Sequence, residues 1–266
     1  MTLAGFPYSA DYNSFMSCES LQELCLTGQQ LLAAQEYVEA EQVLVRAESE
    51  AIKHRDWDTL ARLYLPLQEA RRQRRQRSLQ GLFCLDLASD GPDDHIEGRH
   101  ILENYPHGVL LIAGWGTIEP ALQTRKLQAR FKLYVDVLLG ATYPLIGGGN
   151  AIVVIAHEHA ILPPVCPRRI DEIRGVMPPH SLVFKDGDLP AGPRHGTPEL
   201  ASRVQGWWEQ LHWPFIVDAR DTRNLRKRIG AYRRAIEVDY GCELAHQELC
   251  DTARQLSREE TAAVRM

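Results

Sequence analysis

Two short apolar runs dominate the hydrophobic pattern in the middle of the chain. Residues 109–113 read Val-Leu-Leu-Ile-Ala, and residues 152–155 read Ile-Val-Val-Ile. Aliphatic runs of this length without polar alternation are typical of strands that are covered on both faces. The segment between them is long enough for a helix, so we predict that the two strands and this helix form a βαβ unit.

The residues around this unit predict further strands and helices. Thr117 is suited to cap the connecting helix, and Pro120 is suited to its first turn. The buried stripe of that helix is predicted to be Leu127, Phe131, Tyr134, Val135 and Leu138. Other strands are predicted at residues 82–87, 181–184 and 214–217, and other helices from residue 92 to Glu103 and from Thr197 onward. Strands that alternate with helices predict an α/β fold with a mostly parallel sheet of about four to five strands and crossover helices.

At both ends of the chain, the small and apolar residues are instead spaced as in paired helices. Near the start, the positions at the intervals of one helical hairpin are Gly28, Glu36, Tyr37, Ala40, Leu44 and Ala47. Near the end, repeat-like positions are Tyr232, Ala235, Tyr240, Leu249 and Ala253. These two stretches resemble the tetratricopeptide repeat (TPR), a helical hairpin of about 34 residues. The resemblance implies TPR-like helical hairpins at both ends and a role in binding other proteins.

These patterns divide the chain into three parts. We expect a TPR-like helical segment at residues 1–79, an α/β domain at 80–217, and a second TPR-like segment at 218–266. The second segment is expected to pack on the rest of the molecule. Within the first segment, a turn is predicted at residues 54–57, and Pro66 predicts a kink or a break in the following helix.

Composition restricts the class of protein without naming its activity. Hydrophobic residues make up 44% of the chain and charged residues 24%, as in ordinary globular proteins, and the net charge of −5 argues against nucleic acid as a partner. The six cysteines form no CxxC pair, which favours the reducing cytoplasm over a disulfide framework. The start of the chain lacks the features of a signal peptide. The uncharged stretch 137–156 is interrupted by Pro144 and three glycines, so we expect no membrane span.

In a parallel sheet, ligands bind beyond the carboxyl ends of the strands. That rule gathers four segments of this chain, at residues 88–94, 114–117, 157–159 and 185–188. The candidate ligand-binding residues within them are Asp90, Gly114, Trp115, Gly116, Thr117, His157, His159 and Asp186. No specific cofactor is indicated.

Each candidate has more than one interpretation. The Gly114-Trp115-Gly116 turn could cradle a phosphate at a helix start, although Glu119 would repel it, or could be a tight turn only. His157 and His159 would project to the same side of an extended chain and could share a metal ion, or they could solvate a strand end. Gly147-Gly148-Gly149 precedes a strand, so we expect it at the opposite edge as a flexible connection.

The arginine-rich stretches 71–77 and 223–234 could bind phosphates, but solvated faces or salt bridges suit an acidic protein better. Cys166 could pair with His157 or His159 as a nucleophile, although nothing nearby would lower its pKa. The sequence therefore favours a protein-interaction or scaffold protein with TPR-like helices around an α/β body and a protein as its partner. The alternative is an enzyme that binds a metal or phosphate ligand around His157 and His159.

Overall fold

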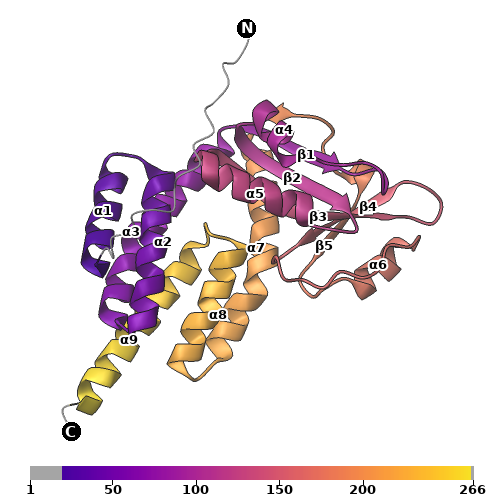
Figure 1. The fold of residues 1–266 in the computed structure, drawn as a ribbon. Coiled ribbons are helices and arrows are strands. Elements are labelled where there is room, and N and C mark those ends of the chain that lie inside the picture. The colour runs from indigo at the N-terminus through magenta and orange to yellow at the C-terminus, as the bar shows by residue number, and fades with distance from the viewer. Residues whose placement is uncertain (1–19, 265–266) are drawn as a thin grey trace.

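Helices from both ends of the chain meet beside a central sheet (Figure 1). A computed structural model describes residues 20–264. The helices outside the sheet are α1 (Leu21–Ala33), α2 (Tyr37–His54), α3 (Trp57–Leu79), α8 (Leu225–Val238) and α9 (Glu243–Val264). The strands are β1 (Leu82–Ala88), β2 (His107–Trp115), β3 (Tyr134–Pro144), β4 (Asn150–Ile155), β5 (Leu182–Lys185) and β6 (Arg194–His195). The remaining helices are α4 (Gly98–Asn104), α5 (Glu119–Phe131), α6 (Ile170–Val176), α7 (Pro198–Asp221) and the 3-10 turn η1 (Asp186–Asp188).

One hydrophobic core joins the two helical ends. Helix α3 packs against α9, α9 packs against α8, and α8 packs against α7. Fully buried side chains from both ends lie in this core, among them Tyr64, Leu67, Tyr232 and Leu249. Residues that are more than 150 positions apart in the sequence therefore stabilise each other.

The first two helices approach closely because of one glycine. A Cβ atom at Gly28 would lie 2.5 Å from Leu44 Cδ2, which is closer than real Cβ contacts allow. Helix α1 begins at a capping box in which Ser20 and Glu23 bond each other's backbone N–H groups. The turn predicted at residues 54–57 is confirmed, since α2 ends at His54 and α3 begins at Trp57.

The sheet is mixed, which corrects the expectation of a mostly parallel sheet of four to five strands. Among the described residues it has six strands in the order β5-β4-β3-β2-β1-β6. Only the pairs β1·β2 and β2·β3 are parallel, while β3·β4, β4·β5 and β1·β6 are antiparallel. The broad α/β class is confirmed.

The sheet was expected to be mostly parallel because residues 134–138 were assigned to a helix, whereas they form a strand. The stripe Leu127, Phe131, Tyr134, Val135 and Leu138 was expected on one helix, but α5 ends at Phe131 and residues from Tyr134 onward form β3. Lys132 ends the helix in the left-handed conformation with φ of 55°, and Leu133 N–H then bonds Gln128 O. The βαβ unit is therefore β2–α5–β3. Residues 152–155 do form a strand, β4, but it runs antiparallel to β3.

Four other expectations need correction in detail. The glycines at 147–149, all with positive φ, close the β3–β4 hairpin and so lie at the carboxyl end of β3 rather than at the opposite edge. Residues 214–217 were expected as an edge strand but belong to α7. The helix expected from residue 92 begins only at Gly98. Of the kink or break predicted at Pro66, the break is wrong, because helix α3 continues through this residue as one element.

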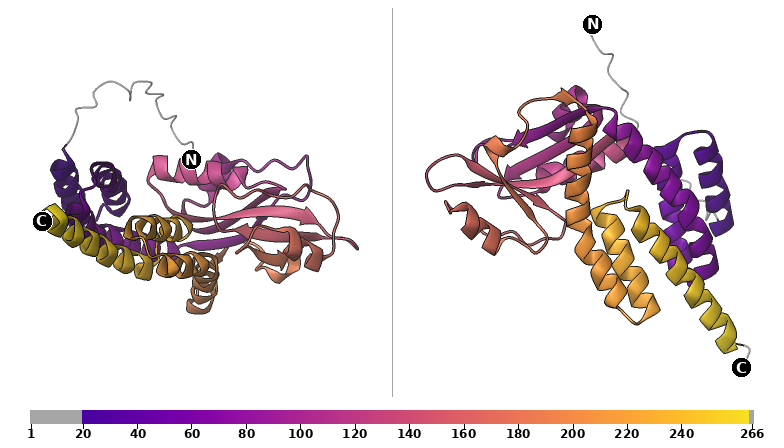
Figure 2. Two further views of the ribbon diagram at one scale, coloured as in Figure 1. Left: turned by 90° about the horizontal axis from the view of Figure 1, so that it is seen from below. Right: turned by 180° about the vertical axis from the view of Figure 1, so that it is seen from behind.

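Helices cover both faces of the sheet (Figure 2). On one face α4 and α5 pack on alternate strand residues such as Leu110, Ile112 and Val137. On the other face Trp207 and Trp208 of α7 pack against the remaining strand residues. Helix α7 then continues beyond the sheet, and its Ile216 and Ala219 enter the helical core. None of the helices within residues 20–264 is long and apolar enough to cross a membrane.

Candidate functional site

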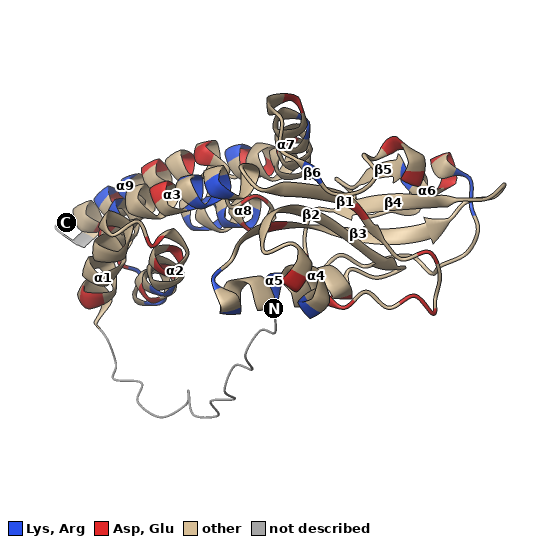
Figure 3. Cartoon of the chain, turned by 90° about the horizontal axis from the view of Figure 1, so that it is seen from above, with Lys and Arg blue, Asp and Glu red and all other residues tan. Residues whose placement is uncertain are grey.

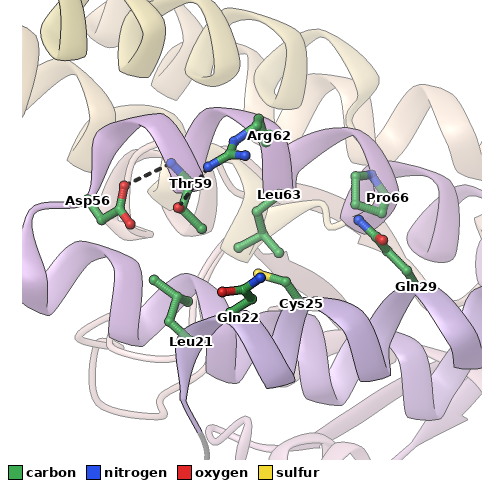
Figure 4. A pocket seen from close by; sticks show the side chains of 9 residues that line it. All are labelled: Leu21, Gln22, Cys25, Gln29, Asp56, Thr59, Arg62, Leu63 and Pro66. Atoms are coloured by element: carbon green, nitrogen blue, oxygen red, sulfur yellow. Dashed lines mark hydrogen bonds between the residues drawn. The ribbon is translucent and has the colours of Figure 1, made fainter.

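A cleft of about 450 Å³ lies between α1 and α3 (Figure 4). Its lining residues are Leu21, Gln22, Cys25, Gln29, Asp56, Thr59, Arg62, Leu63 and Pro66. The residues at positions 22, 25 and 29 repeat at three and four positions, so α1 presents them on one face. The start of α3 is fixed by Asp56, whose carboxylate accepts the Thr59 N–H at 2.9 Å.

The lining of this cleft offers free hydrogen-bonding groups, an exchangeable ion pair and an apolar centre. Within the described part of the chain, no hydrogen-bond partner is found for the side-chain amides of Gln22 and Gln29. Seven residues of helix separate these two amides by roughly 10 Å, close to the length of three residues of extended chain. Arg62 forms a solvent-exposed pair with Asp58 at 2.9 Å, a pair that an incoming carboxylate could exchange. Between the amides lies Cys25, whose thiol pKa is raised by burial, so it is a neutral apolar contact rather than a nucleophile.

A second polar region lies where α3 meets the sheet and α8. Lys and Arg positions gather on this part of α3 (Figure 3), and the arginine run at 71–77 supplies them. The Glu41 carboxylate on α2 lies 3.0 Å from Arg71 Nε and 2.6 Å from Arg74 NH1. Burial alone would raise the pKa of Glu41, but Arg74 and Arg71 outweigh it and lower the pKa to about 2. These arginines therefore form buried salt bridges, one of the interpretations that the sequence favoured.

Two further carboxylates hold Arg75. Its Nε lies 2.8 Å from Asp136 Oδ2 on β3, and its NH2 lies 2.9 Å from Asp239 Oδ1 after α8. The guanidinium of Arg75 also stacks over the Trp208 ring at 3.5 Å from the centroid. Tyr240 donates its hydroxyl to Asp136. Arg75 thus links α3, the sheet, α7 and the α8–α9 connection.

A Cys–His–Asp arrangement adjoins this cluster. Asp239 Oδ2 lies 2.9 Å from His212 Nδ1, and His212 Nε2 lies 3.4 Å from Cys242 Sγ. Although burial works against the imidazolium, the bonds to Asp239 and Cys242 raise the pKa of His212 to about 9. A nucleophilic cysteine needs such a base, itself oriented by a third group. However, His212, Asp239 and Cys242 are 7%, 6% and 5% exposed, so the arrangement joins helices rather than facing a substrate.

His246 of α9 has the opposite electrostatics. It lies 1% exposed, its Nε2 is 2.9 Å from Arg71 NH1, and its Nδ1 is 2.8 Å from the Cys242 carbonyl. Burial, reinforced by repulsion from Arg71, lowers its pKa to about 3. His246 is therefore a neutral acceptor for Arg71 and a donor to the Cys242 carbonyl.

The residues that were expected to share one edge of the sheet lie at two different edges in the structure. Asp90, the segment from Gly114 to Thr117, and Asp186 follow β1, β2 and β5, whose carboxyl ends share one edge. There Asp90 N–H bonds Asp94, Thr117 accepts the Glu119 N–H, and Asp186 accepts the Asn150 N–H at 3.1 Å. Gly114, Trp115 and Gly116 form a turn in which Gly116 has φ of 61°. These contacts are those of turns that connect elements.

His157 and His159 lie at the other edge, because β4 runs antiparallel to β3. His157 packs edge-on against Phe215, and the His159 side chain is 88% exposed beside Glu158. They are not brought together with Asp90 or Asp186. No group of three or more His, Cys, Asp or Glu side chains within residues 20–264 is arranged to hold a metal ion.

Sequence reasoning missed the acids that organise the arginines. Glu41, Asp136 and Asp239 are each less than 10% exposed. A signal for Asp136 was present, since a lone acid within the apolar run Val-Asp-Val needs a buried partner.

No family model, curated protein or solved structure matches this chain.

Proposed function

We propose that this is a cytoplasmic protein-interaction protein, and that the α1–α3 cleft binds an extended peptide segment of a partner protein. The observation that carries the proposal is the pair of amides of Gln22 and Gln29 along one side of the cleft. Primary amides offer both donors and acceptors, the groups that an exposed peptide backbone requires. The resemblance of residues 28–47 to a tetratricopeptide repeat supports the same function.

The lining also favours one kind of peptide. An apolar side chain fits against Leu63, which lies beside Cys25 at the centre of the cleft, or against Pro66, which lies at one end near Gln29 (Figure 4). An acidic side chain fits toward Arg62, whose present partner Asp58 is 69% exposed and therefore weakly held. We therefore expect peptides with an apolar residue and an acidic residue within a few positions of each other.

Selection from a random peptide library displayed on phage, with the full chain as target, tests this function. Selected peptides are synthesised, and their affinity is measured by fluorescence anisotropy. Replacing Gln29→Ala removes bonds to the peptide backbone and should weaken binding by about fivefold to tenfold, since each such bond contributes about 1 kcal/mol. The matched control is Gln30→Ala, an exposed neighbour outside the cleft, which should leave affinity unchanged.

Two results would overturn the proposal. One is a selection that yields no peptide with saturable binding to the full chain. The other is a set of peptides whose affinity falls equally with Gln29→Ala and Gln30→Ala, because the binding surface would then lie elsewhere. Circular dichroism of both variants should match the parent chain, since both side chains are exposed on α1.

A further inference from the structure

A cavity of about 210 Å³ lies where α3, α5, β3 and α8 meet. Its polar lining comes mainly from Arg74, Arg75, Arg125, Gln128, Asp136 and Tyr240. It is smaller than the roughly 300–1,000 Å³ of sites for drug-sized ligands. Because β3 contributes its first residues, the cavity lies at the amino edge of the parallel strands, away from the edge where ligands were expected.

Arg125 differs from the other two arginines in this cavity. Its Nε donates to the Val137 carbonyl at 2.9 Å, and no carboxylate within residues 20–264 forms an ion pair with it. Burial lowers the pKa of Arg125 to about 10; attraction to Asp136 and Glu158 opposes this effect, and repulsion from Arg74 and Arg75 adds to it. By contrast, attraction to Glu41 and Asp136 raises the pKa values of Arg74 and Arg75 despite their burial. Among the three arginines of this cavity, Arg125 is therefore the one whose charge the surrounding protein compensates least.

The cavity also has an unused hydrogen-bond donor. Asp136 and the exposed Glu237 are the acids in its lining, while Glu41 and Asp239 pair with Arg74 and Arg75 from outside it. The buried Nε–H of Arg74 finds no acceptor within the described part of the chain. Buried donors without an acceptor are rare in native proteins, and they indicate a missing ligand or water.

We propose that this cavity binds a small oxyanion, a single phosphate group, held mainly by the terminal nitrogens of Arg125. A guanidinium presents its donors as a planar fork that matches two oxygens of a phosphate group. The bound anion also gives Arg125 an ion-pair partner, which Arg74 and Arg75 already have in Glu41 and Asp239. This inference does not depend on the peptide-binding cleft, which lies between other elements and shares no lining residue with the cavity.

The same chemistry could come from free inorganic phosphate or from a small phosphomonoester. Glu237 is exposed and Arg74 is largely buried, so one side of the cavity is open to solvent. A phosphomonoester could place its phosphate at Arg125 and its organic part toward that opening. The relative affinities of inorganic phosphate and glycerol 3-phosphate distinguish the two sources.

Isothermal titration calorimetry of the full chain at constant ionic strength tests the site, with chloride as the reference anion. Inorganic phosphate should bind with one-to-one stoichiometry. The affinity of the variant Arg125→Gln for phosphate should be lower by at least about tenfold, since hydrogen bonds to charged groups contribute about 1.5–3 kcal/mol. The matched control is Lys126→Gln, which removes an exposed positive charge one residue away and should bind phosphate like the parent chain.

Thermal unfolding separates loss of the site from loss of the fold. Without phosphate, Arg125→Gln should melt at the same temperature as the parent chain or above it, because the variant removes a partly buried charge that has no ion-pair partner within residues 20–264. With phosphate, the parent chain should gain stability and the variant should not. Binding of inorganic phosphate or of glycerol 3-phosphate supports the site, and the anion that binds more tightly shows whether the ligand is free phosphate or a phosphomonoester. Failure of both anions to bind, or equal binding by Arg125→Gln and the parent chain, would overturn the inference.

Discussion

Replacing Asp136→Asn should strongly destabilise the protein, because this carboxylate neutralises buried arginines. The Asp136 side chain is 2% exposed, and its oxygens lie 2.8 Å from Arg75 Nε and 3.9 Å from Arg74 NH2. At an effective dielectric constant of about 20, these distances correspond to about 6 and about 4 kcal/mol of attraction. Desolvation of the charged groups offsets several kcal/mol of this attraction, and removing one partner of a buried ion pair costs about 3–5 kcal/mol.

The assay is urea unfolding followed by tryptophan fluorescence, since Trp208 lies against the guanidinium of Arg75. We expect Asp136→Asn to lower the free energy of unfolding by about 3–5 kcal/mol, a large part of the about 5–15 kcal/mol that holds typical domains folded. Glu237→Gln is the matched control, because this acid lines the same cavity but is exposed. Its effect should stay within about 0.5 kcal/mol.

A double variant measures the pair itself. Arg75→Gln combined with Asp136→Asn should cost less than the two single substitutions together, because each single substitution leaves a buried charge without its partner. A loss below about 1 kcal/mol for Asp136→Asn would refute the reasoning, since buried pairs lose more than that when broken. Strict additivity of the two substitutions would refute it as well.

Two buried histidines predict opposite pH dependences. The pKa of His212 is raised from 6.5 to about 9, so its contribution to the free energy of unfolding is complete below pH 6.5 and is lost as pH rises through 9. The midpoint of urea unfolding should therefore be measured for the parent chain and for His212→Gln between pH 6.5 and 9. The difference between the two midpoints should become smaller as pH rises, and a constant difference would contradict this prediction. The pKa of His246 is lowered from 6.5 to about 3, so its contribution is complete above pH 6.5 and is lost as pH falls toward 3. His246→Gln should therefore lose less stability than the parent chain between pH 6.5 and 4, and an equal loss would show that His246 is not held neutral.

Local sequence predicted the elements whose signals are local. The strands at residues 109–113 and 181–184 were found from apolar runs, and the turn before Trp57 was found from its polar residues. Strand β3 was missed because its apolar residues continue the three-and-four spacing of α5. The helix ends at Lys132 in a left-handed conformation that glycine usually adopts, so the expected stop signal was absent. Placing β3 on a helix then reversed the expected direction of β4 and moved His157 to the wrong edge.

The polar cluster could not be predicted for a different reason. Arg75 contacts Asp136 and Asp239, which follow it by 61 and 164 residues, and no local pattern encodes such pairings. The sequence showed that the arginine run was exceptional, but it did not show which acids neutralise it. The resemblance to a helical repeat predicted a role in binding other proteins, but it did not identify the residues of the cleft between α1 and α3.

The shared helical core has a consequence for how the chain acquires its structure during synthesis. The face of α3 that carries Tyr64 and Leu67 is covered by α9, which begins at Glu243. Roughly 160 residues must be translated between these helices, which takes on the order of ten seconds or more at about 5–20 residues per second. During that interval the nascent chain exposes an apolar helix surface, so ribosome-bound intermediates should be clients of chaperones that shield such surfaces.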